Sequence, residues 1–158
     1  MKFSIHANMC DQTTTRIAAA IREPFELIGR ELSKDYGGTM EYLWIDFELI
    51  ERHAELRAPF PFRFQKKVGG STSKLTGLPT PVHQNVGHYS VRPDFRVLRS
   101  TPLESVVGYA LSEIYASTVV LVEKQKKLGG FDAAKFRSDF VTSCRKHGYA
   151  LTGNENRG

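Results

Sequence analysis

The chain has 158 residues, of which 41% are hydrophobic and 25% charged, and its formal net charge is +5. This length fits one domain with a sizeable hydrophobic core. Two cysteines are too few for a disulfide framework, and no apolar run approaches the ~20 residues of a membrane span. The N-terminal segment lacks the apolar stretch of a secretory signal. We therefore expect a soluble, cytoplasmic protein with a single domain over residues 1–151 and a polar tail over 152–158.

Three segments carry the apolar spacing of amphipathic helices. The first covers residues 13–36, and Pro24 inside it predicts a kink or two abutting helices. The second covers residues 101–127 and opens with Thr-Pro-Leu-Glu at 101–104, which predicts a capping box with Pro102 in the first turn. The third covers residues 132–147, where Asp132 is the expected cap and Phe131 is expected to pack on Phe136.

Three other segments alternate apolar and polar residues with the period of a strand: 40–50, 60–68 and 87–98. A short strand over Lys2–His6 is a further possibility that the sequence does not decide. Pro93 predicts an edge position or a bulge for the third segment, and residues 69–87 are expected to form a long loop. The order α-β-β-β-α-α predicts an α+β fold, in which helices cover one face of a small, mainly antiparallel sheet of three to four strands.

Motifs for catalysis or cofactor binding are absent from the sequence, so no cofactor is expected. The five histidines have no partners at metal-ligand spacing, so no metal site is expected. Cys144 falls on the inward side of the last predicted helix and is expected to be a buried, inert thiol. Cys10 precedes the first predicted helix and has no catalytic partner at a recognised spacing.

The polar faces of the three predicted strands form the one notable constellation, provided that the strands are neighbours. Tryptophan, tyrosine and arginine are the residue types that anchor interfaces. The candidate partner-binding residues are Tyr42, Trp44, Asp46, Glu48, Arg63, His88, Arg92 and Arg96. The alternative is a solvated face of weak cross-strand charge pairs. A hydrolytic pair of His88 with Asp46 depends on a strand register that the sequence does not fix.

The leading hypothesis is a non-enzymatic protein-binding domain, of the inhibitor, immunity or antitoxin type, that binds and neutralises a partner protein. The net positive charge fits an acidic partner, while Asp46, Glu48, Glu51 and Glu55 could form a local acidic patch. One alternative is a nucleic-acid-binding protein that uses its basic side chains for phosphate and Trp44 or Tyr42 for stacking. A second alternative is an enzyme with an unrecognised site in which His88 acts as the base.

Overall fold

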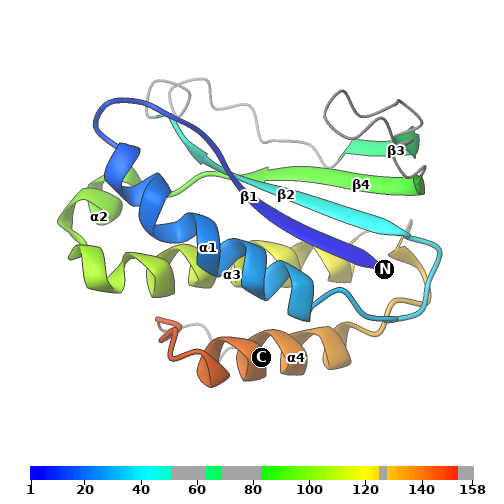
Figure 1. Cartoon of the computed structure of the whole chain (residues 1–158). Helices are drawn as coiled ribbons and strands as arrows, with labels where there is room; N and C mark the ends of the chain where they lie inside the picture. Colours follow the sequence, from blue (N-terminus) through cyan, green and yellow to red (C-terminus); the bar gives the residue numbers. More distant parts are fainter. Residues whose placement is uncertain (51–62, 69–82, 125–127, 153–158) are drawn as a thin grey trace, which may run out of the picture.

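A computed structural model of the chain describes residues 1–50, 63–68, 83–124 and 128–152. They form a sheet with helices packed against one of its faces (Figure 1). The strand order is β1-β2-β4-β3, made of β1 (Lys2–Cys10), β2 (Tyr42–Leu49), β4 (His83–Val91) and β3 (Arg63–Val68). The α+β class predicted from the sequence is confirmed.

The prediction of a mainly antiparallel sheet is wrong. Strands β1, β2 and β4 run parallel to one another, and β3 pairs antiparallel with β4 at the edge of the described sheet. The error has two sources: β4 lies between β2 and β3, so that β2 pairs with β4 and not with β3, and β1, which is nine residues long, opens the element order with a strand instead of a helix. From β1 the chain passes through α1 (Thr15–Glu31) and returns to β2. Such a helical crossover leaves the two strands parallel.

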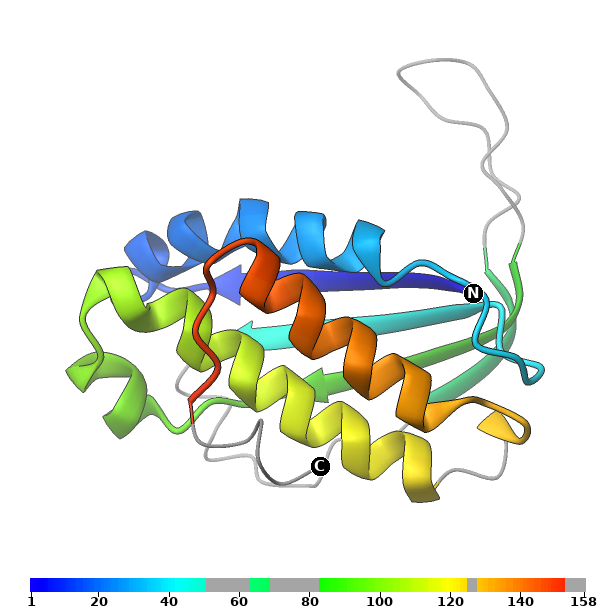
Figure 2. The same cartoon turned by 90° about the horizontal axis from the view of Figure 1, so that it is seen from below.

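The helices form a layer on one side of the sheet, and Figure 2 shows them in front of the strands. α4 (Ala133–Lys146) packs against both α1 and α3 (Val106–Lys124). The core between the layers is rich in aromatic rings, and the ring of Phe136 is fully buried. Its centroid lies 5.4 Å from the ring of Phe3 on β1 and 6.0 Å from Phe140 on its own helix. The ring of Phe136 therefore packs α4 against the sheet.

The start of α4 agrees with the sequence. The Asp132 side chain accepts a hydrogen bond from the backbone N–H of Lys135, and the ring centroids of Phe131 and Phe136 lie 5.6 Å apart. Both the cap and the hydrophobic staple are therefore confirmed. α1 is a single helix that continues through Pro24, so the expectation of two abutting helices there is wrong, and the predicted kink stays a prediction.

The segment before α3 differs from the prediction. Thr101 ends the short helix α2 (Phe95–Ser100), and its hydroxyl donates to the carbonyl oxygen of Val97. Leu103–Ser105 forms a single 3₁₀ turn, η2, whose N-terminal flanking residue Pro102 supplies no side-chain hydrogen bond. The predicted capping box is therefore wrong, because the hydroxyl of Thr101 is hydrogen-bonded at the C-terminal end of the preceding helix.

Residues 87–98 do not form one strand. β4 ends at Val91, and α2 begins at Phe95 with Asp94 as its cap, the side chain accepting from the backbone N–H of Arg96. Pro93 has no N–H to donate to a ladder, which fits the end of the strand just before it.

β4 begins at His83, inside the loop predicted for 69–87, and residues 69–82 lie outside the described part of the chain. The same holds for residues 153–158 of the predicted tail.

One described helix, Leu103–Lys124, is long and apolar enough to cross a membrane. The interior of the fold buries 56% of its most apolar stretch. Core helices share this property, so the helix alone does not indicate a membrane protein.

Candidate functional site

The second face of the sheet is free of the described helices (Figure 1). The alternation of β2 puts Leu43, Ile45, Phe47 and Leu49 in the core, and its remaining side chains point to this second face. The register pairs Trp44 with His88 on β4 and Asp46 with His6 on β1. We call the resulting surface the open face; its members are Lys2, Ser4, His6, Tyr42, Trp44, Asp46, Glu48 and His88.

Trp44, the single tryptophan of the chain, lies at the centre of the open face. Its ring stacks on that of Tyr42 at a centroid distance of 6.1 Å. The imidazoles of His6 and His88 lie 4.8 Å and 5.8 Å from it. The indole Nε1–H donates to Asp46 Oδ1 at 2.9 Å. Because neighbouring rings and a hydrogen bond hold it, the indole has little rotamer freedom left to lose on binding.

Asp46 connects Trp44 to His88. Its second oxygen, Oδ2, lies 2.6 Å from Nε2 of His88. The carboxylate is mostly covered, with 13% of the side chain exposed, whereas His88 keeps 33%. The pair that the sequence left open is therefore formed, because β2 and β4 are direct neighbours in a register that places His88 opposite Trp44.

A second set of hydrogen bonds runs along the β1 side of the open face. Nε2 of His6 lies 3.1 Å from Ser4 Oγ, which is 2.7 Å from the Tyr42 hydroxyl. The ammonium group of Lys2 lies 5.3 Å from the centre of the Tyr42 ring, in cation–π range. Desolvation lowers the pKa of His6, and the nearby carboxylates of Asp46 and Glu26 oppose that effect.

The structure brings most of the predicted site residues together. Tyr42, Trp44, Asp46, Glu48 and His88 share the open face, and Nε of Arg92 lies 3.7 Å from Glu48 Oε2. The backbone of Arg63 stands opposite His88 in the β3–β4 register, while its side chain lies outside the described part of the structure.

The placement of Arg96 on this face is wrong. Arg96 lies in α2, with 90% of its side chain exposed, and pairs with Asp94 at 3.5 Å. The sequence reasoning also missed Lys2, Ser4 and His6, because it gave the N-terminal segment no firm strand. The signal was present in the alternation of Phe3 and Ile5, both of which are buried.

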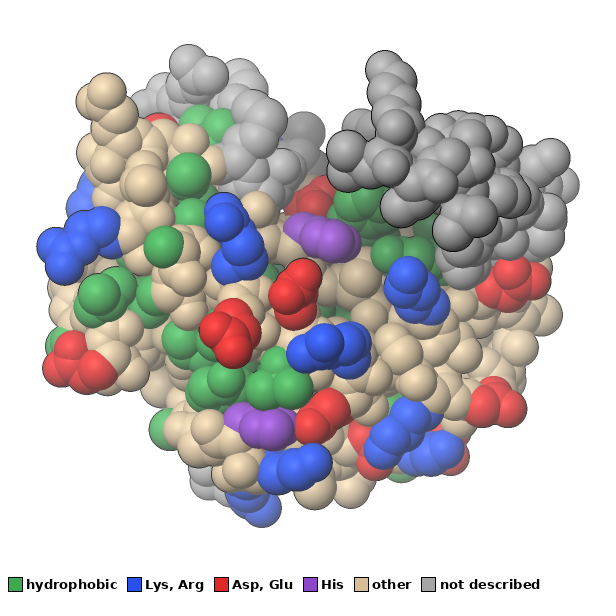
Figure 3. Space-filling view, viewed as in Figure 1, with side chains coloured by type: hydrophobic (Ala, Val, Ile, Leu, Met, Phe, Trp, Pro, Cys, Tyr) green, Lys and Arg blue, Asp and Glu red, His purple; other side chains and the backbone are tan. Residues whose placement is uncertain are grey.

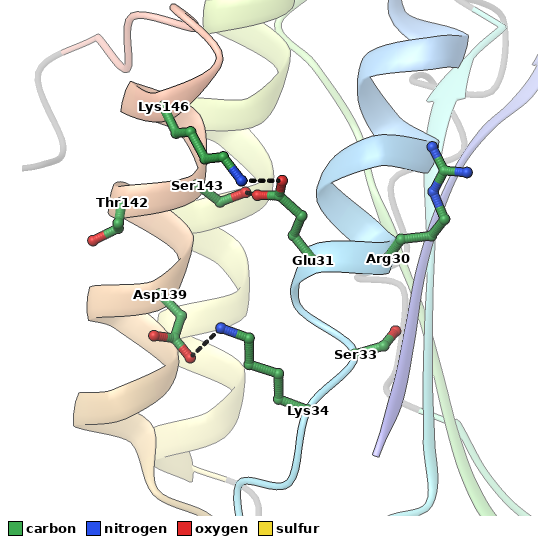
Figure 4. A pocket seen from close by; sticks show the side chains of 8 residues that line it. All are labelled: Arg30, Glu31, Ser33, Lys34, Asp139, Thr142, Ser143 and Lys146. Atoms are coloured by element: carbon green, nitrogen blue, oxygen red, sulfur yellow. Dashed lines mark hydrogen bonds and ion pairs between the residues drawn. The ribbon is translucent and has the colours of Figure 1, made fainter.

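A polar groove between α1 and α4 is the other site-like feature (Figure 4). It encloses about 460 Å³, and ion pairs span it. Glu31 accepts hydrogen bonds from Ser143, Lys146 and His147 of α4 and its end, and these donors lower the pKa of its carboxyl group to about 2. Lys34 and Asp139 form a second link at 3.8 Å. These carboxylates join the two helices, so we assign the groove a structural role.

The described residues offer little for metal or thiol chemistry. No group of three or more His, Cys, Asp or Glu among them could hold a metal ion. Cys144 is buried, as predicted, and burial raises the pKa of its thiol to about 12. Cys10 is exposed at the end of β1.

Charges of both signs lie on the side of the molecule that Figure 3 shows. On the side seen in Figure 3, Lys and Arg side chains are interspersed with Asp and Glu, and no broad patch of one sign forms among the described residues.

No family model, curated protein or solved structure matches the chain. The functional argument therefore rests on the open face.

Proposed function

We propose that this protein is a non-enzymatic binding domain that engages a partner protein through the open face, in the manner of an inhibitor, immunity protein or antitoxin. One observation carries the proposal: Trp44 is held between two imidazoles, stacked on Tyr42 and hydrogen-bonded to Asp46, yet remains partly exposed. A tryptophan fixed before binding is the kind of anchor that contributes most to protein interfaces.

The mixed charge of the face favours a protein over a nucleic acid as the partner. Asp46 and Glu48 lie in the middle strand of the described parallel set, next to the aromatic rings on which a base would stack. The negative charge of these carboxylates would repel the phosphate groups of a nucleic acid. A protein surface, in contrast, can complement both signs of charge. Nucleic-acid binding therefore stays the alternative, and its signature would be an affinity that falls steeply with salt.

The test compares capture of a partner by the wild-type chain, by Trp44→Ala and by Val120→Ala. Val120 is an exposed apolar residue on α3, away from the open face, and serves as the control. The captured partner is then purified and its affinity measured by calorimetry. We expect Trp44→Ala to weaken binding by about 2 kcal/mol or more, as for interface anchors, and Val120→Ala to bind like the wild type.

Two checks make this test decisive. Trp44→Phe keeps a ring on Tyr42 but lacks the N–H donor to Asp46, so it controls for loss of folding in the alanine variant. Circular dichroism of each variant tests whether it is folded. A partner that binds folded Trp44→Ala and the wild type equally well would show that the open face is not the binding surface.

A hydrolase is the second candidate, and the 2.6 Å contact between His88 Nε2 and Asp46 Oδ2 favours it. A carboxylate that orients an imidazole is the arrangement of a general base. In the described part of the chain, however, no serine or cysteine is hydrogen-bonded to the His88 ring. If the protein hydrolyses a substrate, His88→Ala should abolish turnover in a chain that still folds, and retained turnover would remove this candidate.

A further inference from the structure

The outer edge of β1 is a place where the described sheet could take up another strand. β1 lies at one end of the strand order, next to β2. The backbone N–H of Lys2 donates to the carbonyl oxygen of Glu41 at 2.7 Å, on the side of β2. Because successive residues of a strand alternate, the backbone groups of Phe3, Ile5 and Ala7 point to the opposite side, away from β2. Such groups on an edge strand are a template for pairing with another chain.

Helix α1 lies against β1 along this edge (Figure 2). A Cβ on Gly29 would lie 3.1 Å from the carbonyl oxygen of Phe3 and 3.5 Å from the backbone nitrogen of Ile5. The absence of a side chain at Gly29 therefore lets the helix backbone approach the strand backbone closely. Phe3 and Ile5 are each only 2% exposed, so another strand cannot reach their outward N–H and C=O groups while α1 is in place.

Ser33, just after α1, closes the same stretch with hydrogen bonds. Its hydroxyl oxygen accepts from the backbone N–H of Phe3 at 3.0 Å. The hydroxyl proton has two carbonyl acceptors, the oxygen of Phe3 at 3.2 Å and that of Gly29 at 2.8 Å. Ser33 thus occupies the outward backbone groups of Phe3 that a neighbouring strand would otherwise bind.

The second part of β1 is less covered. Ala7 is partly exposed, and no hydrogen bond from a described residue reaches its backbone from the outer side. The pairing with β2 slips in register between Asn8 and Cys10, where the regular strand geometry ends. β1 has no proline and no acidic residue, and Lys2 is its one lysine. The strand's own sequence therefore does little to deter pairing with another strand.

We propose that α1, through Gly29 and Ser33, prevents the outer edge of β1 from pairing with another strand, and that loosening this contact lets β1 pair with the β1 of a second copy of the chain. The second copy is the occupant because it offers the same strand with the same outward backbone groups. Antiparallel pairing of two such edges would satisfy the N–H and C=O groups of both. The inference goes beyond the proposed function, since it concerns the edge of the sheet and not the open face.

The experiment measures the oligomeric state by sedimentation velocity at increasing protein concentration. The wild type should stay monomeric. Gly29→Leu places a side chain against the backbone of β1 and should displace α1, so we expect dimers whose fraction rises with concentration. Adding Ala7→Pro should return this variant to the monomer, because proline removes an outward N–H and leaves the bonds to β2 intact. Circular dichroism tests whether each variant is folded.

Ser33→Ala is a milder change that decides the question if Gly29→Leu does not fold. The backbone N–H of Phe3 then loses its acceptor, so this amide should exchange with solvent at least about fivefold faster, as expected for the loss of one hydrogen bond. Dimers should also form at high concentration. Ser100→Ala is the matched control on α2, where the hydroxyl donates to the carbonyl oxygen of Val97, and it should change neither result.

The contrary outcomes are distinct from one another. A wild type that already forms dimers, which Ala7→Pro dissociates, would show that α1 does not close the edge. Dimers of Gly29→Leu that persist with Ala7→Pro would overturn the role of β1. Monomers in every folded variant would overturn the pairing with a second copy. None of these results bears on capture of a partner through Trp44, which tests the proposed function separately.

Discussion

Two carboxylates in this protein each lie 2.6 Å from Nε2 of a histidine, but they serve different regions. Glu31 pairs with His147 in the helix layer, where it also binds Ser143 and Lys146 and joins α1 to α4. Asp46 pairs with His88 on the open face, where its other oxygen holds the indole of Trp44. The surroundings of such a pair, and not the pair itself, indicate its role: the first is a link between helices, and the second orders a partly exposed aromatic surface.

This comparison predicts opposite effects of substitution. A change in the helix layer should lower stability and leave binding at the open face intact. A change on the open face should alter binding and leave stability nearly unchanged.

The largest effect is expected for Gly108→Ala on α3. A Cβ at this position would overlap with the carbonyl oxygen of Ala150, so the C-terminal segment would have to move. That segment is fixed by the hydrogen bond from Thr152 N–H to Ser112 Oγ and by the burial of Leu151. Overpacking of this kind should lower the free energy of unfolding by about 1–3 kcal/mol, which urea denaturation followed by circular dichroism would measure.

Val120→Ala is the control on the same helix, since Val120 is exposed and its loss should change stability by less than ~0.5 kcal/mol. If Gly108→Ala unfolds at the same urea concentration as the wild type, the C-terminal segment contributes nothing to the stability of the helix layer.

An intermediate effect is expected for Glu31→Gln. The pKa of Glu31 is about 2 in the folded chain and 4.5 without its partners, so the ionised form stabilises the fold. This contribution is complete above the unfolded value and is lost as the pH falls from about 4.5 to about 2. A quarter of the side chain is exposed, and screening reduces the contribution to about 1–2 kcal/mol.

The measurement is the stability of wild type and Glu31→Gln between pH 2 and pH 7. The wild type should lose stability over the acidic part of this range by more than the variant, so the two curves should converge near pH 2. Glu104→Gln, which replaces an exposed glutamate in η2, is the matched control. Parallel curves for wild type and Glu31→Gln would show that Glu31 does not join α1 to α4.

The same contrast between regions explains what the sequence could predict. The helix layer follows from local signals: Asp132 and Phe131 mark the start of α4, and the spacing of apolar residues marks α1 and α3. The face of β2 also follows, because its alternation separates Leu43 and Ile45 from Tyr42 and Trp44. Such signals depend on neighbours within a few residues along the chain.

The composition of the site could not be predicted in the same way. The contacts of Trp44 with His6 and of Asp46 with His88 require β1 and β4 on either side of β2, and that order depends on pairing between distant segments. A parallel sheet has no hairpin turn to fix the register of its strands. Arg96 was misplaced for a related reason, since the alternation continues past Pro93 although the strand ends before it.

The smallest effect on stability is expected for Asp46→Asn. The amide keeps the shape of the carboxylate and an oxygen for the Trp44 N–H, so the free energy of unfolding should fall by less than ~1 kcal/mol. What changes is the charge beside His88, whose ring loses a carboxylate partner and faces a neutral amide instead. Urea denaturation of wild type and Asp46→Asn, followed by circular dichroism, measures this difference in stability. If Asp46→Asn instead destabilises the fold as strongly as Glu31→Gln, then Asp46 also acts as a structural link, and the distinction between the two carboxylates fails.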